Sequence, residues 1–335
     1  MHHPSDQPNP QLVWETMLAH QRTYALKAGI EFGVFDALGA GPQTAAALAT
    51  RAGLAERPVR ILCDYLTVIG LIAKQGNAYQ HTPTSAVFLD KHSPASMAPS
   101  LPFIMSEKLL LGGRLLLETI RRNHTALPEP IAGEEVEEWV TFARTMQPVT
   151  GGAAGFIANT LTANAAKLNK VLDVASSHGM FGLAIAKAVP SCEIVALDFP
   201  TVLEVTKENA AAAGVAITPL PGSAFTAELG TGYDAILVTN LLHHFNQEDC
   251  ITLLKRFHAA LAPGGRVAIL EFVPNEDRVS PPVPASFALG MLANTPAGDA
   301  YTFAEYEQML DAAGFGARSI VNVPMSPQQL IVATA

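Results

Sequence analysis

The chain has 335 residues, of which 49 % are hydrophobic and 15 % are charged, and its formal net charge is −9. This length allows one or two domains with a large core, and the acidic balance argues against general affinity for nucleic acids or anionic membranes. We expect no membrane span, because no run of 18 apolar residues occurs. We also expect no signal peptide, because the first residues do not have the pattern that opens one. Three scattered cysteines without a C-x-x-C pair favour reduced thiols in a cytoplasmic protein.

The first hundred residues predict a small helical domain that contains a hairpin. Helical apolar spacing from Leu12 to Leu38 is interrupted at Gly29 and Gly33, so we expect two helices there. Two shorter helices follow, and residues 71–81 predict two strands joined by a Gly-Asn turn. Helix, turn, helix and hairpin in this order are typical of a winged helix.

A winged helix often binds DNA, and that alternative makes a prediction about charge. Phosphate binding requires a basic excess. Residues 1–100 contain seven Lys or Arg and seven Asp or Glu, so there is no such excess. The sequence therefore argues against a DNA-binding regulator.

Residues 170–198 predict the part of the chain around which the rest is organised. A short apolar strand is followed by a turn of small residues, a helix, and a second strand that ends in Asp198. This order is typical of the mononucleotide-binding half of a doubly wound fold, in which the turn holds a cofactor and the second acid takes ribose hydroxyls. A structural crossover without a ligand is the alternative.

The composition of the turn separates two classes of cofactor. A dinucleotide site has G-x-G-x-x-G, but the first two glycine positions are Ala175 and Ser177 here, and only Gly179 remains. S-adenosylmethionine (SAM) has no phosphate, so it makes a looser demand on the turn. Asp198 lies 19 residues after Gly179, as an adenosine ribose requires. The pattern favours SAM over a nicotinamide cofactor.

The remaining elements predict an open α/β sheet of seven strands, with the last strand antiparallel. Pro219 places the third strand at an edge, and Thr302 with Glu305 forms a capping box for the last helix. The expected strands after the first two are residues 216–220, 233–239, 266–272, 319–323 and 330–333.

Five stretches of this half resemble the SAM-dependent O-methyltransferases of the plant caffeic-acid type and of the bacterial hydroxyneurosporene or polyketide type. They are residues 170–190, 196–215, 233–250, 261–278 and 295–315, and the resemblance extends over nearly the whole chain. It implies a Rossmann-like methyltransferase domain over 166–335, a helical linker and substrate lid over 101–165, and a winged-helix dimerisation domain over 1–100. It also implies a homodimer that needs no metal and methylates a hydroxyl, expected to be phenolic, of a small apolar molecule.

His243 and Glu271 are the candidate catalytic residues. A phenol with a pKa of about 10 must lose its proton before it attacks a methyl group, and a histidine suits that task near neutral pH. The family's L-H-D-W pattern appears as Leu242-His243-His244-Phe245, and Glu271 matches the acid that orients the histidine. A metal site formed by His243, His244 and Glu271 is an alternative, as is a histidine without function in a loop.

The resemblance also supplies candidates for the two binding sites. Ser223 stands where the family has an Asp that contacts the adenine amine, and Asp299 precedes the position of a third family acid. The cofactor candidates are Asp173, Ala175, Ser177, Gly179, Asp198, Phe199, Gly222, Ser223, Ala224, Phe225 and Thr239. The acceptor candidates are Phe103, Met105, Phe142, Met146, His244 and Asp299.

These patterns together predict a SAM-dependent O-methyltransferase. A C- or N-methyltransferase on the same fold is the closest alternative, and a SAM-binding protein that has lost transfer is another. A nicotinamide oxidoreductase is disfavoured by the turn, and a winged-helix regulator is disfavoured by the charge. The sequence does not name the acceptor.

Overall fold

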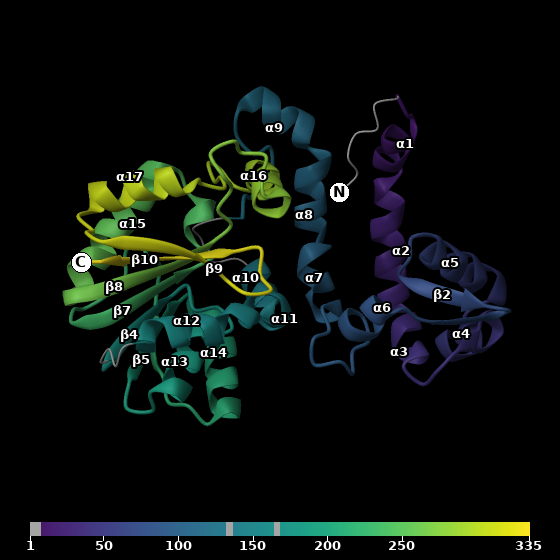
Figure 1. Ribbon diagram of the computed structural model, residues 1–335, viewed down its shortest axis with the longest axis horizontal. Helices are drawn as coiled ribbons and strands as arrows, with labels where there is room; N and C mark the ends of the chain where they lie inside the picture. The colour runs from purple at the N-terminus through teal and green to yellow at the C-terminus, as the bar shows by residue number, and fades with distance from the viewer. Residues whose placement is uncertain (1–7, 132–136, 164–167) are drawn as a thin grey trace. The chain divides into compact units, whose positions relative to one another are not determined.

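The computed structural model describes residues 8–131, 137–163 and 168–335. They form two compact units, with the division between Leu101 and Pro102. Within these residues no helix has the length and apolar character needed to cross a membrane. Figure 1 shows the helices and strands of both units, most of them labelled.

The first unit combines helices with a sheet of three short strands in the order β1-β3-β2. One apolar cluster forms its core, with Phe35, Cys63 and Leu66 almost fully buried. The helices are α1 (Gln11–Met17), α2 (Ala19–Glu31), α3 (Val34–Leu38), α4 (Ala45–Ala52), α5 (Glu56–Val68), α6 (Pro83–Phe88) and the 3-10 helix η1 (Ala98–Ser100). The strands are β1 (Gln43–Thr44), β2 (Ile72–Gln75) and β3 (Ala78–His81).

The N-terminal helices differ from the prediction in number and in where they break. Three helices occupy the stretch expected to hold two, and the first break is at Leu18 rather than Gly29. Gly29 lies inside α2, where an added Cβ would approach the Phe35 ring to 2.9 Å, so this glycine serves close packing. Gly33 does end a helix, with a left-handed φ of 65°.

The second unit contains a seven-stranded sheet in the order β6-β5-β4-β7-β8-β10-β9. β10 runs antiparallel to both of its neighbours, β8 and β9, as expected for a final hairpin. Pro219 lies in β6 at one edge, where a missing backbone N–H is tolerated. The strands are β4 (Lys170–Val174), β5 (Glu193–Asp198), β6 (Thr218–Pro221), β7 (Tyr233–Thr239), β8 (Leu261–Glu271), β9 (Arg318–Asn322) and β10 (Gln329–Thr334).

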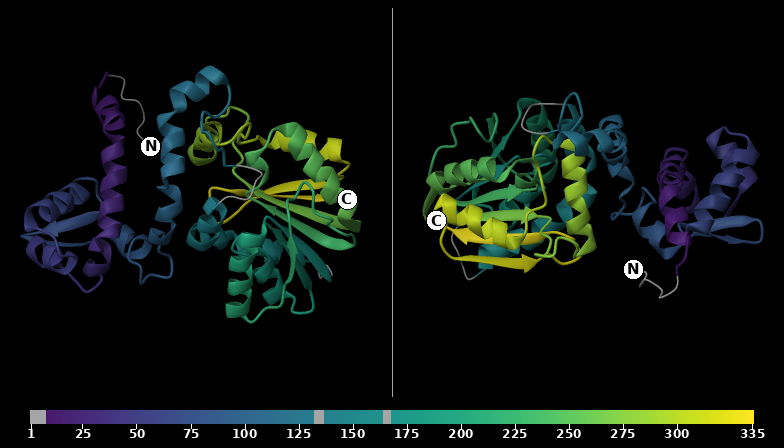
Figure 2. Two further views of the ribbon diagram at one scale, coloured as in Figure 1. Left: turned by 180° about the vertical axis from the view of Figure 1, so that it is seen from behind. Right: turned by 90° about the horizontal axis from the view of Figure 1, so that it is seen from above.

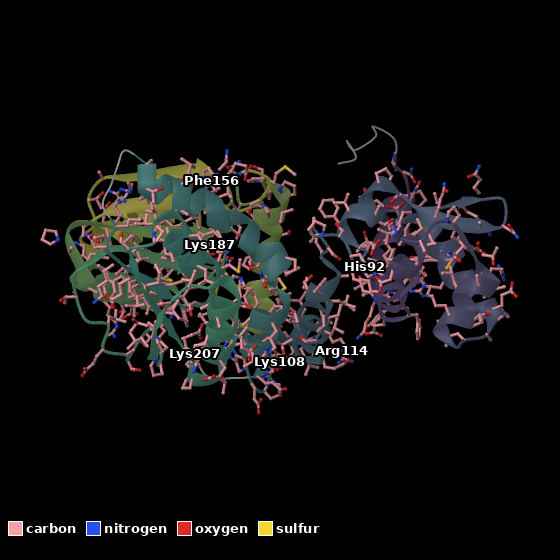
Figure 3. The ribbon with its side chains drawn as sticks, turned by 90° about the horizontal axis from the view of Figure 1, so that it is seen from below. His92, Lys108, Arg114, Phe156, Lys187 and Lys207 are labelled. Atoms are coloured by element: carbon pink, nitrogen blue, oxygen red, sulfur yellow. The ribbon has the colours of Figure 1, made fainter. Side chains whose placement is uncertain are left out.

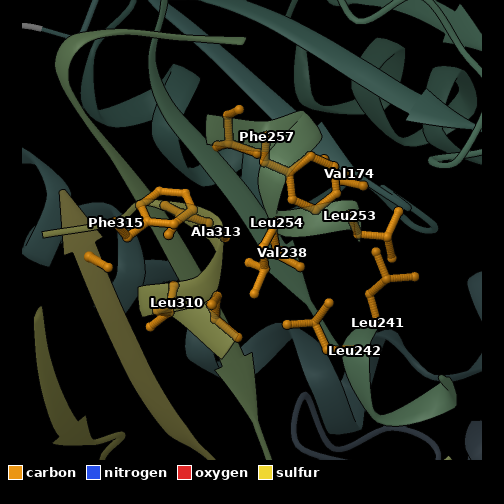
Figure 4. Close-up of a cluster of buried hydrophobic side chains, with 14 of the residues drawn as sticks. Val174, Val238, Leu241, Leu242, Leu253, Leu254, Phe257, Leu310, Ala313 and Phe315 are labelled. Carbon is orange, nitrogen blue, oxygen red and sulfur yellow. The ribbon is translucent and has the colours of Figure 1, made fainter. Parts of the chain in front are cut away.

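Helices cover both faces of this sheet (Figure 2). On one face lie α15 (Gln247–Ala260) and α17 (Phe303–Ala313), and their apolar side chains meet those of the strands in the cluster drawn in Figure 4. On the other face lie α12 (Ala154–Thr162), α13 (Met180–Ala188) and α14 (Pro200–Ala213). Lys187 and Lys207, labelled in Figure 3, are exposed on the outer side of these helices.

A further group of helices lies beside the carboxyl ends of the strands. They are α7 (Leu101–Ile104), α8 (Glu107–Arg114), α9 (Leu116–Arg122), α10 (Glu137–Thr145), α11 (Gln147–Thr150), the 3-10 helix η2 (Gly151–Ala153) and α16 (Pro282–Asn294). Hydrogen bonds fix the segment after α9 to the end of α16: Thr125 Oγ1 donates to the Ala293 carbonyl, and Ile131 N donates to that of Asn294. This group therefore supplies a wall next to the sheet.

Candidate active site

A cavity of about 400 Å³ lies at the carboxyl ends of the central strands, within the second unit. Open α/β sheets bind their ligands at this edge. One end of the cavity is lined by the loops that follow β4, β5 and β6, and the other end by residues of α10 and α16 and of the segment after β7. We call these the cofactor end and the acceptor end.

The turn after β4 keeps the shape of a glycine-rich turn without most of the glycines. Ala175 and Ser177 have φ angles of 51° and 53°, and Gly179 has one of 76°. Left-handed φ angles strain residues other than glycine and persist only where surrounding contacts hold them. Here Thr206 Oγ1 donates to the Ser177 carbonyl at 2.6 Å, so α14 holds the turn from behind.

The two acids of the cofactor end have different surroundings. Asp198 lines the cavity, and its carboxylate accepts hydrogen bonds from Ser177 N and Phe199 N, both at 2.7 Å. Asp173 is fully buried and does not line the cavity, and its Oδ2 accepts from Gly182 N at 2.9 Å. Burial, with a smaller contribution from the charge of Asp198, raises the pKa of Asp173 to about 7. Asp173 thus fixes the turn to α13, whereas Asp198 faces the ligand space.

His178 joins the turn to the neighbouring helices. Its Nδ1 accepts from Met180 N at 3.1 Å, which leaves Nε2 to donate to Thr150 Oγ1 at 2.6 Å. Asn209 Nδ2 donates to the His178 carbonyl at 2.9 Å. Burial lowers the pKa of His178 to about 4, so the ring is neutral at physiological pH. The geometry gives this histidine a positioning role.

The cofactor end fits SAM. Asp198 offers a carboxylate for ribose hydroxyls, and the buried Ser177 Oγ has no hydrogen-bond partner within the described parts of the chain. Phe199, Val202 and Phe225 supply apolar surface for a purine ring. No Lys or Arg occurs among the described lining residues, so a pyrophosphate would meet no cation there.

His243 and Glu271 meet at the acceptor end. The 3-10 turn η4 (Leu242–His244) follows β7, and Glu271 ends the adjacent strand β8. Glu271 Oε1 accepts from Leu241 N at 3.0 Å and Leu242 N at 2.9 Å, while Oε2 is 2.6 Å from His243 Nδ1. A carboxylate only accepts, so His243 carries a proton on Nδ1 and its Nε2 is the atom available as a base. The two side chains are almost fully buried.

His244 is in contact with the candidate base. Its Nε2 is 3.1 Å from His243 Nε2, and its ring meets Trp139 at 5.1 Å between centroids. Desolvation, followed by the effect of His243, lowers the pKa of His244 well below its ordinary value. His244 is therefore neutral at physiological pH, and it lines the cavity beside His243.

Aromatic rings form much of the wall at the acceptor end. Phe103 and Phe142 meet edge to face at 5.0 Å between centroids, and Phe287 meets His243 in the same way at 4.9 Å. Phe272 stacks on Phe287 at 4.1 Å. Such a wall suits a flat, apolar acceptor.

Most, but not all, of the residues selected from the sequence line this cavity. Asp173, Gly179 and Glu271 lie behind it and support lining residues. Met105 is buried but does not line the cavity. The selected residues that do line it are Ala175, Ser177, Asp198, Phe199, Gly222, Ser223, Ala224, Phe225, Thr239, Phe103, Phe142, Met146, His243 and His244.

Asp299 does not line the cavity either, although the sequence suggested it for the acceptor site. Its side chain is 42 % exposed, and its carboxylate is 3.7 Å from Arg278. Its backbone N donates to the His243 carbonyl at 3.0 Å, so this segment supports the loop of the base rather than the acceptor.

Sequence reasoning missed Trp139, Phe272, Phe287, Met291 and Asn294 among the lining residues. Phe287 and Met291 are four residues apart on α16, which places them on one helix face. That spacing predicts that the two side chains share one face of the helix. It does not determine whether this face packs into the core or lines a binding site. No group of three or more His, Cys, Asp or Glu suited to a metal occurs within the described ranges.

Comparison with known proteins relates both units to one family. The model of the O-methyltransferase domain matches residues 133–316, and that of the O-methyltransferase dimerisation domain matches residues 14–91. A 3-hydroxy-5-methyl-1-naphthoate 3-O-methyltransferase of Streptomyces sahachiroi is 27 % identical, with 91 % of this chain and 89 % of the relative covered. An L-tyrosine C(3)-methyltransferase of Streptomyces lavendulae is 26 % identical, with 96 % and 92 % covered.

Solved structures share the fold. A candidate O-methyltransferase of Nostoc punctiforme PCC 73102 has a TM-score of 0.95 and 41 % identity, with 98 % of this chain and all of that chain covered. Human N-acetylserotonin methyltransferase, solved with SAM, has a TM-score of 0.84 and covers 99 % of each chain at 22 % identity, which shows a common fold.

Proposed function

The chain belongs to the O-methyltransferase family, and from that premise we propose that His243 is the general base for methylation of a phenolic hydroxyl on a flat, apolar small molecule. SAM is the cofactor of this family. The observation that carries the assignment of the base is the His243–Glu271 hydrogen bond of 2.6 Å, made at the edge of the cavity.

The chemistry requires a deprotonated acceptor held in line with the donor. When bound, SAM supplies a methyl group already activated for transfer. His243 Nε2 takes the acceptor proton, and the Glu271 carboxylate stabilises the imidazolium that forms. The aromatic wall and the buried turn orient the reactants, and such alignment contributes roughly 7–11 kcal/mol at best.

At the cofactor end, Asp198 is proposed to bind the ribose hydroxyls, and the loop with Ser223 and Phe225 to contact the purine. Ser223 Oγ accepts from Phe225 N at 3.3 Å, so this hydroxyl is also used to shape its own loop. The other proposed contacts come from Ala175, Ser177, Phe199, Gly222, Ala224 and Thr239.

At the acceptor end, Phe103, Phe142 and Met146 are proposed to hold the acceptor, with residues 101–165 acting as its lid. These side chains line the cavity from helices outside the sheet. Met and aromatic side chains adapt to flat apolar ligands. This assignment makes 1–100 the dimerisation domain and 166–335 the SAM-binding domain.

A homodimer is proposed for the assembly. Helix α1 has no buried residues, and Leu12, Trp14 and Met17 are 60–70 % exposed. Apolar side chains exposed on this scale mark a surface that a partner covers, and the dimerisation model matches residues 14–91. Light scattering at micromolar concentration should give the mass of two chains, and a monomer would contradict the proposal.

Two variants test the assignment of base and ribose ligand with opposite expected results. His243→Ala should lose about 10²–10⁴ in turnover while its affinity for SAM stays near that of the wild type. Asp198→Ala should bind SAM at least about tenfold more weakly, because charge-assisted hydrogen bonds contribute roughly 1.5–3 kcal/mol each. Calorimetry gives the affinities, and product mass with labelled SAM gives the rates.

Near wild-type turnover by His243→Ala at neutral pH would remove the general base from the mechanism. The reaction would then rest on an acceptor that is already ionised, such as the carbanion of a C-methylation. The C(3)-methyltransferase among the relatives makes that outcome worth measuring, since product mass and position identify the methylated atom.

A further inference from the structure

We propose that His244 selects acceptors whose methylated hydroxyl is flanked by a hydrogen-bond-accepting oxygen, as in an ortho- or peri-hydroxy carbonyl compound. The inference deepens the proposed function and rests on it, because it takes His243 as the base. It follows from which ring nitrogen of His243 and of His244 must carry a proton for their hydrogen bonds to form.

The proton of His243 is placed by Glu271. Oε1 of this carboxylate already accepts two backbone N–H groups at 2.9–3.0 Å, and Oε2 is 2.6 Å from His243 Nδ1. Neutral His243, the form that acts as a base, therefore has its only proton on Nδ1. Its Nε2 carries a lone pair and no proton.

The proton of His244 follows from that assignment. The two Nε2 atoms are 3.1 Å apart, and a hydrogen bond between them needs one proton. Because His243 Nε2 has none, neutral His244 must carry its proton on Nε2. Its Nδ1 is then a bare acceptor, and this buried atom indeed has no partner within the described ranges. An unpaired buried acceptor is tolerated better than an unpaired buried donor.

In the structure the His243 Nε2 lone pair and the His244 Nε2–H satisfy each other, so a bound acceptor must replace this hydrogen bond with one to each ring. His243 Nε2 can accept from a hydroxyl, and His244 Nε2–H can donate to an oxygen next to that hydroxyl. An ortho-hydroxy carbonyl compound contains the complementary pair, since its O–H is hydrogen-bonded to its own carbonyl. That internal bond makes the hydroxyl hard to ionise, and the two histidines offer a replacement for each half of it.

The proton transfer in such a complex balances. The hydroxyl proton passes to His243 Nε2, which leaves a phenolate and an imidazolium held by Glu271. His244 keeps its own proton and donates it as a hydrogen bond to the flanking carbonyl oxygen. Trp139 meets the His244 ring edge to face and Phe287 meets the His243 ring in the same way, so aromatic side chains border the cavity beside both histidines.

The residue type at position 244 decides whether it donates or accepts the hydrogen bond to the oxygen beside the methylated hydroxyl. The family pattern that the sequence resembles has Asp here, and an ionised Asp can only accept. A carboxylate would favour a second hydroxyl beside the first, as in catechol. Neutral His244 instead favours a carbonyl or another oxygen without a proton.

The test compares acceptor binding to the dimer loaded with S-adenosylhomocysteine, so that it does not depend on turnover. The probes are ortho-hydroxyacetophenone, para-hydroxyacetophenone and catechol, measured by calorimetry. The wild type should bind the ortho isomer about tenfold more tightly than the para isomer, as expected for one well-placed hydrogen bond. His244→Phe should lose this preference, and His244→Asp should shift it toward catechol.

Two further variants separate selection from folding. His244→Gln keeps an N–H donor and should restore part of the preference for the ortho isomer. Lys187→Gln changes an exposed side chain of α13 outside the cavity and should leave all three affinities unchanged. S-adenosylhomocysteine affinity shows that each variant is folded.

Equal binding of the two isomers by the wild type, or an unchanged ratio in His244→Phe, would overturn the proposal. Such a result leaves the role of His243 intact as long as His243→Ala still loses turnover. A fully active His243→Ala would instead remove the proposed function itself, so the two failures are distinguishable.

Discussion

The cofactor end and the acceptor end of the cavity are built in different ways. At the cofactor end, backbone groups of one short turn and one strand end set the shape, and hydrogen bonds of 2.6–2.7 Å hold it. At the acceptor end, side chains from helices far apart in the chain meet through ring contacts. Hydrogen-bonded backbone fixes one ligand, whereas adaptable side chains accommodate a variable one.

This difference predicts opposite sensitivities. The cofactor end should respond strongly to small changes that alter backbone conformation, even where no ligand contact is lost. The acceptor end should tolerate changes of side-chain shape and respond in acceptor preference. Three substitutions test the comparison, in order of decreasing expected effect.

Gly179→Ala should have the largest effect. The φ of 76° strains any residue with a Cβ, by roughly 1–2 kcal/mol, and the added Cβ would lie 2.7 Å from Thr206 Cγ2. Overpacking adds about 1–3 kcal/mol. Urea unfolding should therefore show a loss of about 2–5 kcal/mol, and SAM affinity should fall although Gly179 does not line the cavity.

Gly155→Ala provides the matched control for this change. Gly155 lies in α12 with no left-handed φ, and no atom of the described residues lies within 4 Å of an added Cβ, apart from the helix's own nearby backbone. Its stability should stay the same or rise slightly, because alanine favours a helix. Equal losses in the two variants would mean that backbone conformation is not what distinguishes the cofactor end.

His178→Gln should reveal a pH-dependent contribution of the same turn. Burial lowers the pKa of His178 from 6.5 to about 4 in the folded protein. Between these values the unfolded chain binds a proton that the folded chain does not. The contribution of neutral His178 to stability is therefore fully present above pH 6.5 and is lost as the pH is lowered toward 4. By pH 4 the wild type should lose up to about 3 kcal/mol relative to the variant, as urea unfolding at several pH values would show.

Measuring the difference in stability between the wild type and His178→Gln removes the contribution of Asp173, which changes with pH in the opposite direction. The pKa of Asp173 is raised to about 7, so this acid lowers stability as pH rises from about 4 to 7. That contribution is common to wild type and variant and cancels in their difference. A difference that does not change with pH would show that His178 is not held neutral by burial.

The same comparison explains what could be predicted from the sequence. The turn, Asp198 and the edge position of the third strand follow from patterns that are contiguous in the chain, and the seven-stranded sheet with an antiparallel last strand is confirmed. The capping box of Thr302 and Glu305 is also confirmed, since both of its hydrogen bonds are present. Local chemistry determines each of these features.

The features that the sequence did not predict depend on packing between segments that are distant in the chain. Phe287 and Trp139 line the cavity because their helices pack beside η4, and no local pattern places those helices there. Asp299 was assigned by its position in a motif, but its side chain pairs with Arg278 instead. Gly29 was taken as a helix break, although it is a point of close contact with Phe35.

Phe142→Leu should have the smallest effect, and only at the acceptor end. Leucine keeps most of the apolar volume but removes the edge-to-face contacts with Phe103 at 5.0 Å and Trp139 at 6.3 Å. Aromatic pairs contribute about 0.5–1.5 kcal/mol beyond their buried area, so KM for a flat acceptor should rise about two- to tenfold. SAM affinity should not change, because the ring contacts of Phe142 are with Phe103 and Trp139 and not with Asp198 or its turn. If SAM affinity fell as much as acceptor affinity, the two ends would be mechanically coupled through α10, and the division between a fixed cofactor end and an adaptable acceptor end would be wrong.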